Sequence, residues 1–147
     1  DNHKHYAAKV VSMGYMELDD FEDQVACHFD KVGILCTDMN PIYMQYSAIH
    51  KLVHYVRNSE FVSIVHKCKT KAQKEAAYIA GKLDYVIGAG VMNYDKMVKF
   101  RNANGLNLGR VNKFHTDLKR RINKLTKGVS TKHLQAWVSF ETYLRKF

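Results

Sequence analysis

The fold class is indicated by a short stretch that reads Gly33-Ile34-Leu35-Cys36-Thr37-Asp38. Its unbroken apolar run is typical of a strand that is buried on both faces. Pro41 follows where a helix beginning near Ile42 favours proline, and Ile42–Ala48 can supply that helix. The stretch therefore predicts a strand that ends at Asp38, followed closely by a helix, as in α/β folds.

The segments on either side extend this alternation. We expect a strand over Tyr6–Met13, because small and β-branched residues are frequent there, and a helix over Glu17–Phe29, which has acids in its first turn. After the helix expected over Ile42–Ala48, two further segments are predicted to be extended, namely Lys51–Val56 and Glu60–His66. The order of elements argues for an α/β layer carrying a helical tail.

From Lys69 onward the pattern is predicted to be helical. One apolar stripe has helical spacing and consists of Ala72, Ala76, Ile79, Leu83 and Val86. A glycine-rich break follows, and Tyr94–Phe100 is predicted to form another short helix. We interpret residues 67–106 as a helical insertion within one domain that covers residues 1–147.

Composition limits the class of protein. The 147 residues are 46% hydrophobic and 12% aromatic, which suits one ordinary domain with its own core. No stretch approaches the roughly 18 to 20 apolar residues of a membrane span, and no secretory leader is recognisable. The three cysteines form no Cys-x-x-Cys pair, so the sequence suggests neither a disulfide framework nor a structural zinc site. We expect no membrane association and a reducing cytoplasm.

Charge is distributed unevenly. Lys and Arg outnumber Asp and Glu by 23 to 14, a formal charge of +9 that favours a polyanionic partner such as nucleic acid. From Lys96 to Phe147 there are 13 basic and 2 acidic residues, a difference of +11. This third of the chain therefore carries more than the whole net charge, although any single Lys more often belongs to an ordinary solvated helix face.

Two places could carry chemistry. Asp38 lies at the carboxyl end of a buried strand, where open α/β sheets place ligand sites, so it could be a metal ligand or could cap the next helix. The second place is a helix predicted over Arg110–Leu125, which presents Asn112, His115 and Lys119 as a polar stripe. This stripe could hold a metal-bound phosphate or could be a flank in contact with water. The apolar face expected to be buried consists of Val111, Phe114, Leu118, Ile122 and Leu125.

These motifs resemble a known family. Residues Gly109–Lys119 and Lys127–Gln135 resemble the carboxy-terminal signature of bacterial insertion-sequence transposases of the DDE class, in the branch whose third catalytic residue is Asn. Asn112 and Lys119 match the Asn and the Lys seven residues later. Cys36–Tyr43 is similar to the family's second-Asp motif, in which a Tyr comes five residues after the Asp.

The resemblance implies a fold and an activity. The fold would be an RNase H-like α/β fold, a mixed sheet flanked by helices, here lacking its first strands, with a helical insertion and a helical C-terminal tail. The activity would be DNA transposition, a form of DNA recombination in which strands are cleaved and transferred at the ends of a mobile element. Mg²⁺ would be the cofactor, with Mn²⁺ as a substitute. The partners would be double-stranded transposon ends and target DNA, bound by a homo-oligomer associated with the bacterial nucleoid.

The resemblance also implies residue roles. Asp38 and Asn112 would be the metal ligands, Lys119 would contact DNA phosphate, and His115 would orient that phosphate or the water. Further contacts with the DNA backbone would be made by basic residues, namely Arg110, Lys113, Arg120, Arg121 and Lys132.

One departure concerns the first catalytic Asp. In the family this residue lies on an earlier strand, upstream of a hairpin whose turn Asp1-Asn2-His3-Lys4 resembles. We therefore expect the first Asp to lie upstream of Asp1, in a longer transposase or lost from a degenerate copy. Two other functions stay open: a non-catalytic DNA-binding remnant of a transposase, and a basic helical interaction module unrelated to transposition.

Overall fold

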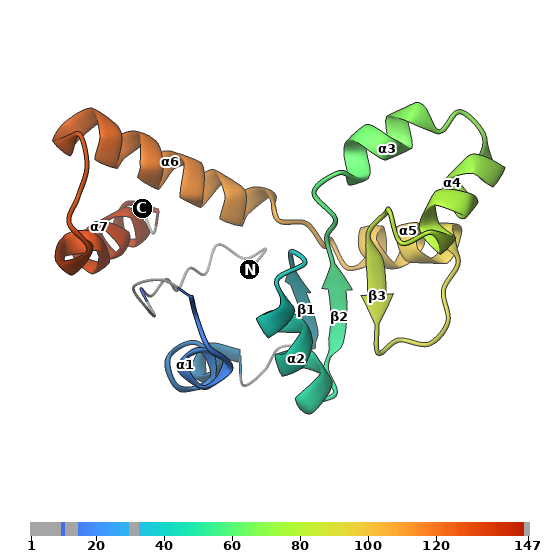
Figure 1. The fold of residues 1–147 in the computed structure, drawn as a ribbon, viewed down its shortest axis with the longest axis horizontal. Helices are drawn as coiled ribbons and strands as arrows, with labels where there is room; N and C mark the ends of the chain where they lie inside the picture. The colour runs from blue at the N-terminus through green and yellow to red at the C-terminus, as the bar shows by residue number, and fades with distance from the viewer. Residues whose placement is uncertain (1–9, 11–14, 30–32, 146–147) are drawn as a thin grey trace. The chain divides into compact units, whose positions relative to one another are not determined.

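The computed structural model describes residue 10 and residues 15–29 and 33–145 (Figure 1). The chain divides into two compact units. Unit 2 is the continuous segment Lys31–Leu108, and unit 1 combines Asp1–Asp30 with Gly109–Phe147. Each unit is built from its own helices and strands and has its own buried side chains.

Unit 2 contains a sheet of three strands, β1 (Ile34–Thr37), β2 (Val53–Val56) and β3 (Tyr85–Ile87). The order is β1-β2-β3, with β1 parallel and β3 antiparallel to β2. Thr37 pairs with Val56, and Val56 pairs with Tyr85. The sequence-based prediction of a mixed α/β fold is confirmed at this level, and β1 lies where it was predicted.

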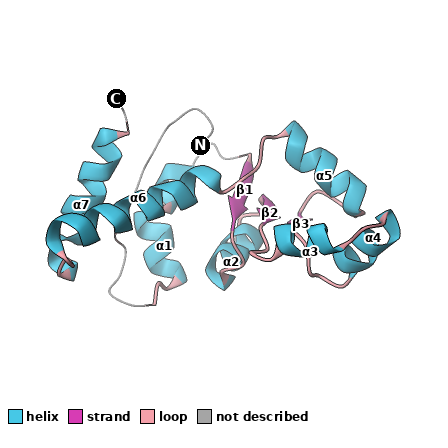
Figure 2. Ribbon diagram, turned by 90° about the horizontal axis from the view of Figure 1, so that it is seen from above, coloured by secondary structure: helices cyan, strands magenta, loops and turns pink. Residues whose placement is uncertain are grey.

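Helices cover both faces of this sheet. The β1–β2 crossover is α2 (Pro41–Ile49), and Figure 2 shows it on the opposite side of the strands from α5 (Tyr94–Ala103). Side chains alternate along a strand, so His54 faces α2 while Tyr55 faces the main core. That core is formed by buried side chains of four elements or their flanks, namely Tyr55, Phe61, Leu83 and Met97.

The prediction that Glu60–His66 is extended is wrong, because Phe61–Lys67 forms the helix α3. Its β-branched residues favour a strand locally, but Phe61, Ile64 and Val65 share one helical face that packs on the core. Val62 on the other side of the helix is 49% exposed. Tertiary burial of the i, i+3, i+4 face therefore outweighs local propensity here.

The helical stripe predicted from Ala72 to Val86 is also wrong in its second half. The helix α4 covers Lys71–Ile79, and Gly81 follows its cap with a left-handed φ of +70. The N–H of Lys82 donates to the carbonyl of Ala77, the bond that commonly terminates a helix at such a glycine. The chain then enters β3, so the segment 67–106 is not purely helical. Within α4, Ala77 and Tyr78 pack against the core, whereas Ile79 is 82% exposed.

Unit 1 is helical in the part that the structure describes. It contains α1 (Leu18–Gln24), a 3₁₀ turn η1 (Ala26–Phe29), the long α6 (Gly109–Thr126) and α7 (Thr131–Leu144). The helices predicted near Glu17–Phe29 and Arg110–Leu125 are therefore confirmed, apart from the 3₁₀ turn that ends the first. In unit 2, α5 confirms the helix predicted near Tyr94–Phe100. The strand expected over Tyr6–Met13 and the turn at residues 1–4 lie outside the described residues, except for Val10, whose N–H donates to Gln135 Oε1 at 2.7 Å.

The apolar stripe of α6 is only partly buried. Phe114 is buried with Phe21 of α1 and Val138 of α7 among the unit's core residues. Val111 and Leu125, at the two ends of the stripe, are 51% and 61% exposed. The prediction of a single buried face therefore holds for the middle of the helix and not for its ends.

None of the helices described is long and apolar enough to cross a membrane.

Candidate functional site

Asp38 follows β1 directly and is exposed. The cap of α2 is Asn40, whose side-chain oxygen accepts from the N–H of Ile42 at 3.0 Å. Asp38 instead accepts from the N–H of Asn40 at 3.2 Å, within the turn before the helix. The alternative that Asp38 is the helix cap is therefore wrong. The Asp38 carboxylate faces solvent, and the bond from Asn40 uses only one of its several hydrogen-bond acceptor sites.

The phenol of Tyr43 lies close to this carboxylate. Burial raises the pKa of Tyr43, and the negative charge of Asp38 raises that pKa further. The Tyr five residues after the Asp is thus brought to the same end of the sheet by the first turn of α2. It stays protonated at neutral pH and can donate a hydrogen bond there.

A buried histidine lies beneath the end of β1. His54 on β2 is fully buried, and its Nε2 lies 2.7 Å from Thr37 Oγ1. Its Nδ1 lies 2.9 Å from Ser47 Oγ on α2. Burial lowers the pKa of His54, so the ring is neutral at physiological pH. These contacts join β1, α2 and β2 directly below Asp38.

A buried carboxylate lies directly before β3. Asp84 is fully buried, and it accepts hydrogen bonds from the hydroxyl of Tyr55 and from the N–H of Asn58, the latter at 2.8 Å. Burial raises the pKa of Asp84, whereas these two bonds and the positive charges of Arg57 and Arg101 lower it, and the net direction is upward. Its donors hold the loop after β2, so Asp84 acts as a structural carboxylate.

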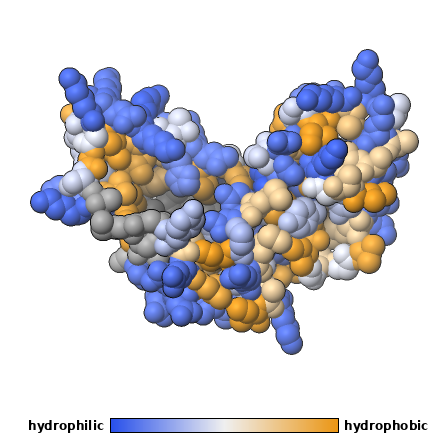
Figure 3. Space-filling view, viewed as in Figure 1, coloured by the Kyte–Doolittle hydropathy of each residue, from blue (hydrophilic) through white to orange (hydrophobic). Residues whose placement is uncertain are grey.

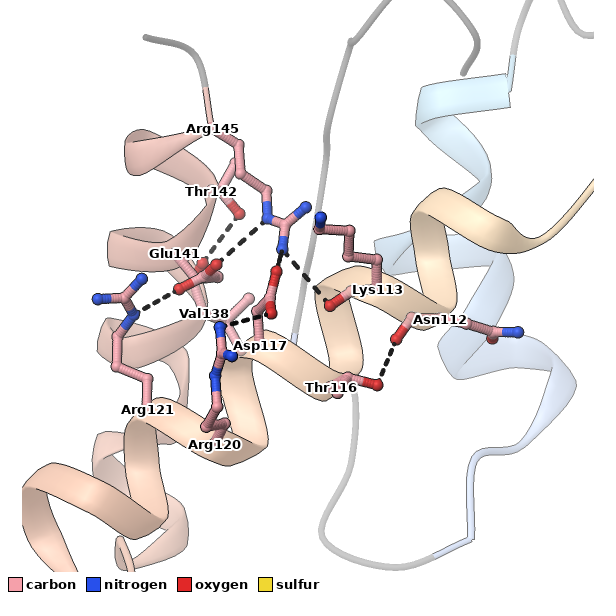
Figure 4. A network of polar contacts seen from close by, with 10 residues as sticks. All are labelled: Asn112, Lys113, Thr116, Asp117, Arg120, Arg121, Val138, Glu141, Thr142 and Arg145. Carbon is pink, nitrogen blue, oxygen red and sulfur yellow. Dashed lines mark hydrogen bonds and ion pairs between the residues drawn. The ribbon is translucent and has the colours of Figure 1, made fainter.

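The residues predicted on α6 form an exposed flank. Asn112, His115 and Lys119 are all exposed, as their spacing of three and four predicts. The backbone carbonyl of Asn112 accepts from Thr116 Oγ1 at 2.9 Å, as Figure 4 shows. On the face of the molecule seen in Figure 3, hydrophilic residues cover much of α6.

The neighbouring flank of α6 is held against α7 by ion pairs (Figure 4). Arg145 of the α7 terminus contacts Asp117 at 2.6 Å and Glu141 at 3.2 Å, and its guanidinium lies 5.2 Å from the centroid of the Phe114 ring. Glu141 is 3% exposed and also pairs with Arg121 at 2.8 Å. We call these five residues the α6–α7 clamp.

No family model, curated protein or solved structure matches this chain.

The clamp divides the five predicted DNA-contacting residues by their environment. Arg121 belongs to the clamp, and Arg120 pairs with Asp117 at 3.0 Å while its side chain stays 74% exposed. Lys113 and Lys132 are exposed, as is Arg110. Arg121 therefore has a structural partner that opposes its use as a phosphate contact, and the exposed cations are better suited to bind DNA.

Metal-binding capacity can be judged from the donors. Carboxylate and amide oxygens suit Mg²⁺, so Asp38 and Asn112 have the right chemistry. Asp38 belongs to unit 2 and Asn112 to unit 1, so the prediction that they share a metal stays a prediction. Within residues 10, 15–29 and 33–145, no group of three or more His, Cys, Asp or Glu side chains is placed to hold an ion.

Sequence reasoning missed the two buried networks. Asp84 was assigned to a helix, although the run Tyr85–Ile87 is β-prone and lies between Gly81 and Gly88, a signal for a short strand. His54 lay on a correctly predicted strand, and nothing in the local pattern shows that its two ring nitrogens meet hydroxyls from β1 and α2. The clamp was missed because two of its ion pairs, Arg121 with Glu141 and Arg145 with Asp117, join residues far apart along the chain.

Proposed function

We propose that this chain is part of the catalytic region of a DNA transposase with an RNase H-like fold. The observation that carries the proposal is the position of Asp38, an exposed carboxylate at the carboxyl end of β1 that does not cap α2. A β1–α2–β2 unit with parallel strands is a setting in which ligand sites occur at that end. The two sequence motifs supply the link to transposition, and the basic third of the chain supplies the link to DNA.

The DNA-binding part of the proposal rests on α6 and its flanks. Lys113, Lys119 and Lys132 are exposed, and residues 96–147 carry 13 basic against 2 acidic residues. Phosphate contacts by such cations release counterions, so affinity falls steeply as salt rises. Lys119 would contact a phosphate near the scissile bond, and His115, exposed one turn earlier, could hydrogen-bond the same phosphate.

The metal-dependent part rests on Asp38 and Asn112. Bound Mg²⁺ would supply a Lewis acid and an activated water or 3′-hydroxyl. The donor chemistry fits, but one exposed carboxylate with one neutral amide is a small set for two divalent ions. We therefore expect weak Mg²⁺ binding by residues 1–147.

The test compares Asp38→Asn with Glu60→Gln, which removes the same charge from another exposed acid of unit 2. Mg²⁺ titration followed by carboxyl ¹³C NMR should perturb the Asp38 resonance in the wild-type chain and in Glu60→Gln, and Asp38→Asn should lose that response. In the intact protein, Asp38→Asn should abolish plasmid nicking in Mg²⁺ while duplex DNA binding persists. Unchanged nicking in Asp38→Asn would overturn the catalytic role.

A second candidate function is a DNA-binding protein without catalysis. It is favoured by the absence of a group of three ligating side chains in the part of the chain that the structure describes. Both candidates predict binding to duplex DNA, so cleavage by the intact protein separates them. No nicking in Mg²⁺ or Mn²⁺, with DNA binding intact, would favour the second candidate.

A further inference from the structure

The inference concerns the hydrogen bonds beneath Asp38. The Thr37 hydroxyl lies within reach of two acceptors, the backbone carbonyl of Asp38 at 2.9 Å and His54 Nε2 at 2.7 Å. The Ser47 hydroxyl also has two, the carbonyl of Met44 at 3.0 Å and His54 Nδ1 at 2.9 Å. The neutral His54 ring has its hydrogen on either Nδ1 or Nε2. This tautomer decides which of the four contacts are hydrogen bonds.

Each hydroxyl has one hydrogen and a neutral imidazole has one N–H, so three hydrogens serve four contacts. If Nε2 carries the ring hydrogen, it donates to Thr37 Oγ1, and the Thr37 hydroxyl is free to donate to the Asp38 carbonyl. Ser47 then donates to Nδ1. If Nδ1 carries the hydrogen, it donates to Ser47, and Thr37 must turn its hydrogen to Nε2, which leaves the Asp38 carbonyl without that bond.

The surroundings favour the first arrangement. The carbonyl of Met44 lies inside α2, where the helical ladder supplies it with a backbone donor, so it tolerates the loss of the Ser47 hydrogen. The carbonyl of Asp38 follows the last residue of β1 and lies beyond the β1–β2 ladder. Losing the Thr37 hydroxyl as a donor therefore destabilises the Asp38 carbonyl more than losing the Ser47 hydroxyl destabilises the Met44 carbonyl. The Met44 carbonyl keeps its backbone donor in either arrangement.

We propose that His54 is a positioning residue for Asp38, acting as the Nε2–H tautomer through the Thr37 hydroxyl. The chain of bonds runs from the Ser47 hydroxyl to His54 Nδ1, from Nε2–H to Thr37 Oγ1, and from the Thr37 hydroxyl to the Asp38 carbonyl. This chain of bonds fixes the peptide group between Asp38 and Met39. The N–H of Asn40 donates to the Asp38 carboxylate itself at 3.2 Å. The functional meaning of this positioning rests on the proposed role of Asp38 as a metal ligand.

The histidine end of the network, at His54 and Ser47, is sheltered from competing water. His54 and Ser47 are 0% and 2% exposed, and the N–H of Arg57 donates to the carbonyl of Thr37 at 2.8 Å, extending the β1–β2 pairing to the end of the strand. A buried bond of this kind loses little to solvent exchange and holds its geometry. The end of β1 is therefore fixed from the neighbouring strand and from α2 before any ligand binds.

The first measurement is the His54 tautomer in the full 147-residue chain with ¹⁵N-labelled histidine. The ring nitrogen shifts and their couplings to ring protons distinguish Nε2–H from Nδ1–H, and we expect Nε2–H. The Nδ1–H tautomer would overturn the proposal, because the Thr37 hydroxyl would then donate to Nε2 and not to the Asp38 carbonyl. This readout needs no variant and no activity.

The second measurement compares Thr37→Val, which keeps the shape and removes the hydroxyl, with Thr37→Ser, which keeps the hydroxyl. We expect the Asp38 carbonyl ¹³C resonance to shift in Thr37→Val and the Mg²⁺ dissociation constant read at the Asp38 carboxyl to rise about fivefold, the loss of one ordinary hydrogen bond. Thr37→Ser should restore both. An Asp38 carbonyl resonance that is the same in all three proteins would overturn the proposal.

Replacing the histidine gives a matched pair. Gln places its amide nitrogen near the position of Nε2 and Asn places it near that of Nδ1, so His54→Gln should preserve the Asp38 carbonyl resonance better than His54→Asn. The reverse order would contradict the assignment. If the wild-type chain shows the Nε2–H tautomer but Mg²⁺ leaves the Asp38 carboxyl resonance unmoved, the proposed metal-binding function fails and the positioning of Asp38 stands.

Discussion

Asp84 illustrates how one residue can organise a loop. Its two oxygens receive the Tyr55 hydroxyl from β2 and the N–H of Asn58 from the loop that follows β2. Arg101 of α5 adds a positive charge close by and also stacks over Phe61 at 5.3 Å from the ring centroid. A buried carboxylate with these partners stabilises the start of α3, but it is desolvated whenever it is ionised.

The pH dependence of stability should reveal this desolvation. Burial raises the pKa of Asp84 above its ordinary value of 3.8, so the folded chain binds this proton more tightly than the unfolded chain does. The resulting stability is fully present below pH 3.8 and is lost as pH rises through the folded pKa. Asp84→Asn removes this loss, so its destabilisation in urea unfolding should be smaller at pH 7 than at pH 4. A penalty that grows from pH 4 to pH 7 would contradict the upward direction.

At the scale of elements, the α6–α7 clamp joins two helices of unit 1 by ion pairs. Arg145 pairs with acids from both helices, and Glu141 is buried between Arg121 and Arg145. Removing one partner of a buried pair leaves its cations without compensation.

We expect Glu141→Gln to destabilise unit 1 by about 2–3 kcal/mol, less than a complete break of a buried pair because Gln keeps one acceptor. Urea unfolding followed by the fluorescence of Trp137, which lies on α7, measures this loss. Asp117→Asn is the comparison, since Asp117 is 18% exposed at its side chain and should cost less. Equal costs for the two variants would mean that burial of Glu141 adds nothing.

The loop after β3 depends on a close approach of backbone. Gly88 has φ +81, and a Cβ placed there would lie 2.9 Å from the carbonyl oxygen of Leu52. Gly90 has a similar φ of +80, but no heavy atom lies within 4 Å of the same position. The two glycines therefore separate backbone strain from steric contact.

Both Gly→Ala changes should cost about 1 kcal/mol for the left-handed backbone conformation. Gly88→Ala should cost about 1–2 kcal/mol more, because the Leu52 carbonyl is backbone and cannot move aside as a side chain can. Circular dichroism during urea unfolding measures the difference. Equal midpoints for the two variants would rule out the steric contribution.

The basic residues of α6 and α7 should divide into two classes when DNA binding is measured. Lys113→Ala and Lys132→Ala remove exposed cations, so each should weaken duplex binding and reduce the slope of log K against log salt by about 1. Arg121→Ala should leave that slope nearly unchanged and lower stability instead, because Arg121 pairs with Glu141. A slope reduced as much by Arg121→Ala as by the lysine variants would show that the clamp opens on DNA.

At the scale of the whole molecule, the two compact units should unfold as separate transitions. Each has its own buried residues, with Tyr55 and Met97 in unit 2 and Phe114 and Val138 in unit 1. Trp137 is the single tryptophan of the chain and lies in unit 1, so its fluorescence follows the unfolding of that unit. Gly88→Ala should therefore shift the transition seen by circular dichroism and leave the Trp137 fluorescence transition in place. A common shift of both signals would mean that the units unfold as one.

The sequence by itself determined β1, α2, α5 and α6 and the exposure of Asn112, His115 and Lys119. These features are encoded locally, by an unbroken apolar run, a proline at the first turn and side-chain spacings of three and four. The resemblance to transposases rests on short sequence motifs and stays a prediction.

Only the tertiary structure decided the conformation of Phe61–Lys67, where the burial of Phe61 against the core overrode a β-prone sequence. It also decided that Asn40 caps α2 in place of Asp38, because that choice depends on the turn between them. The partners of His54 and Asp84 come from other elements of the fold, and no local pattern specifies them. Side-chain networks of this kind follow from strand register and helix packing, which arise when the chain folds.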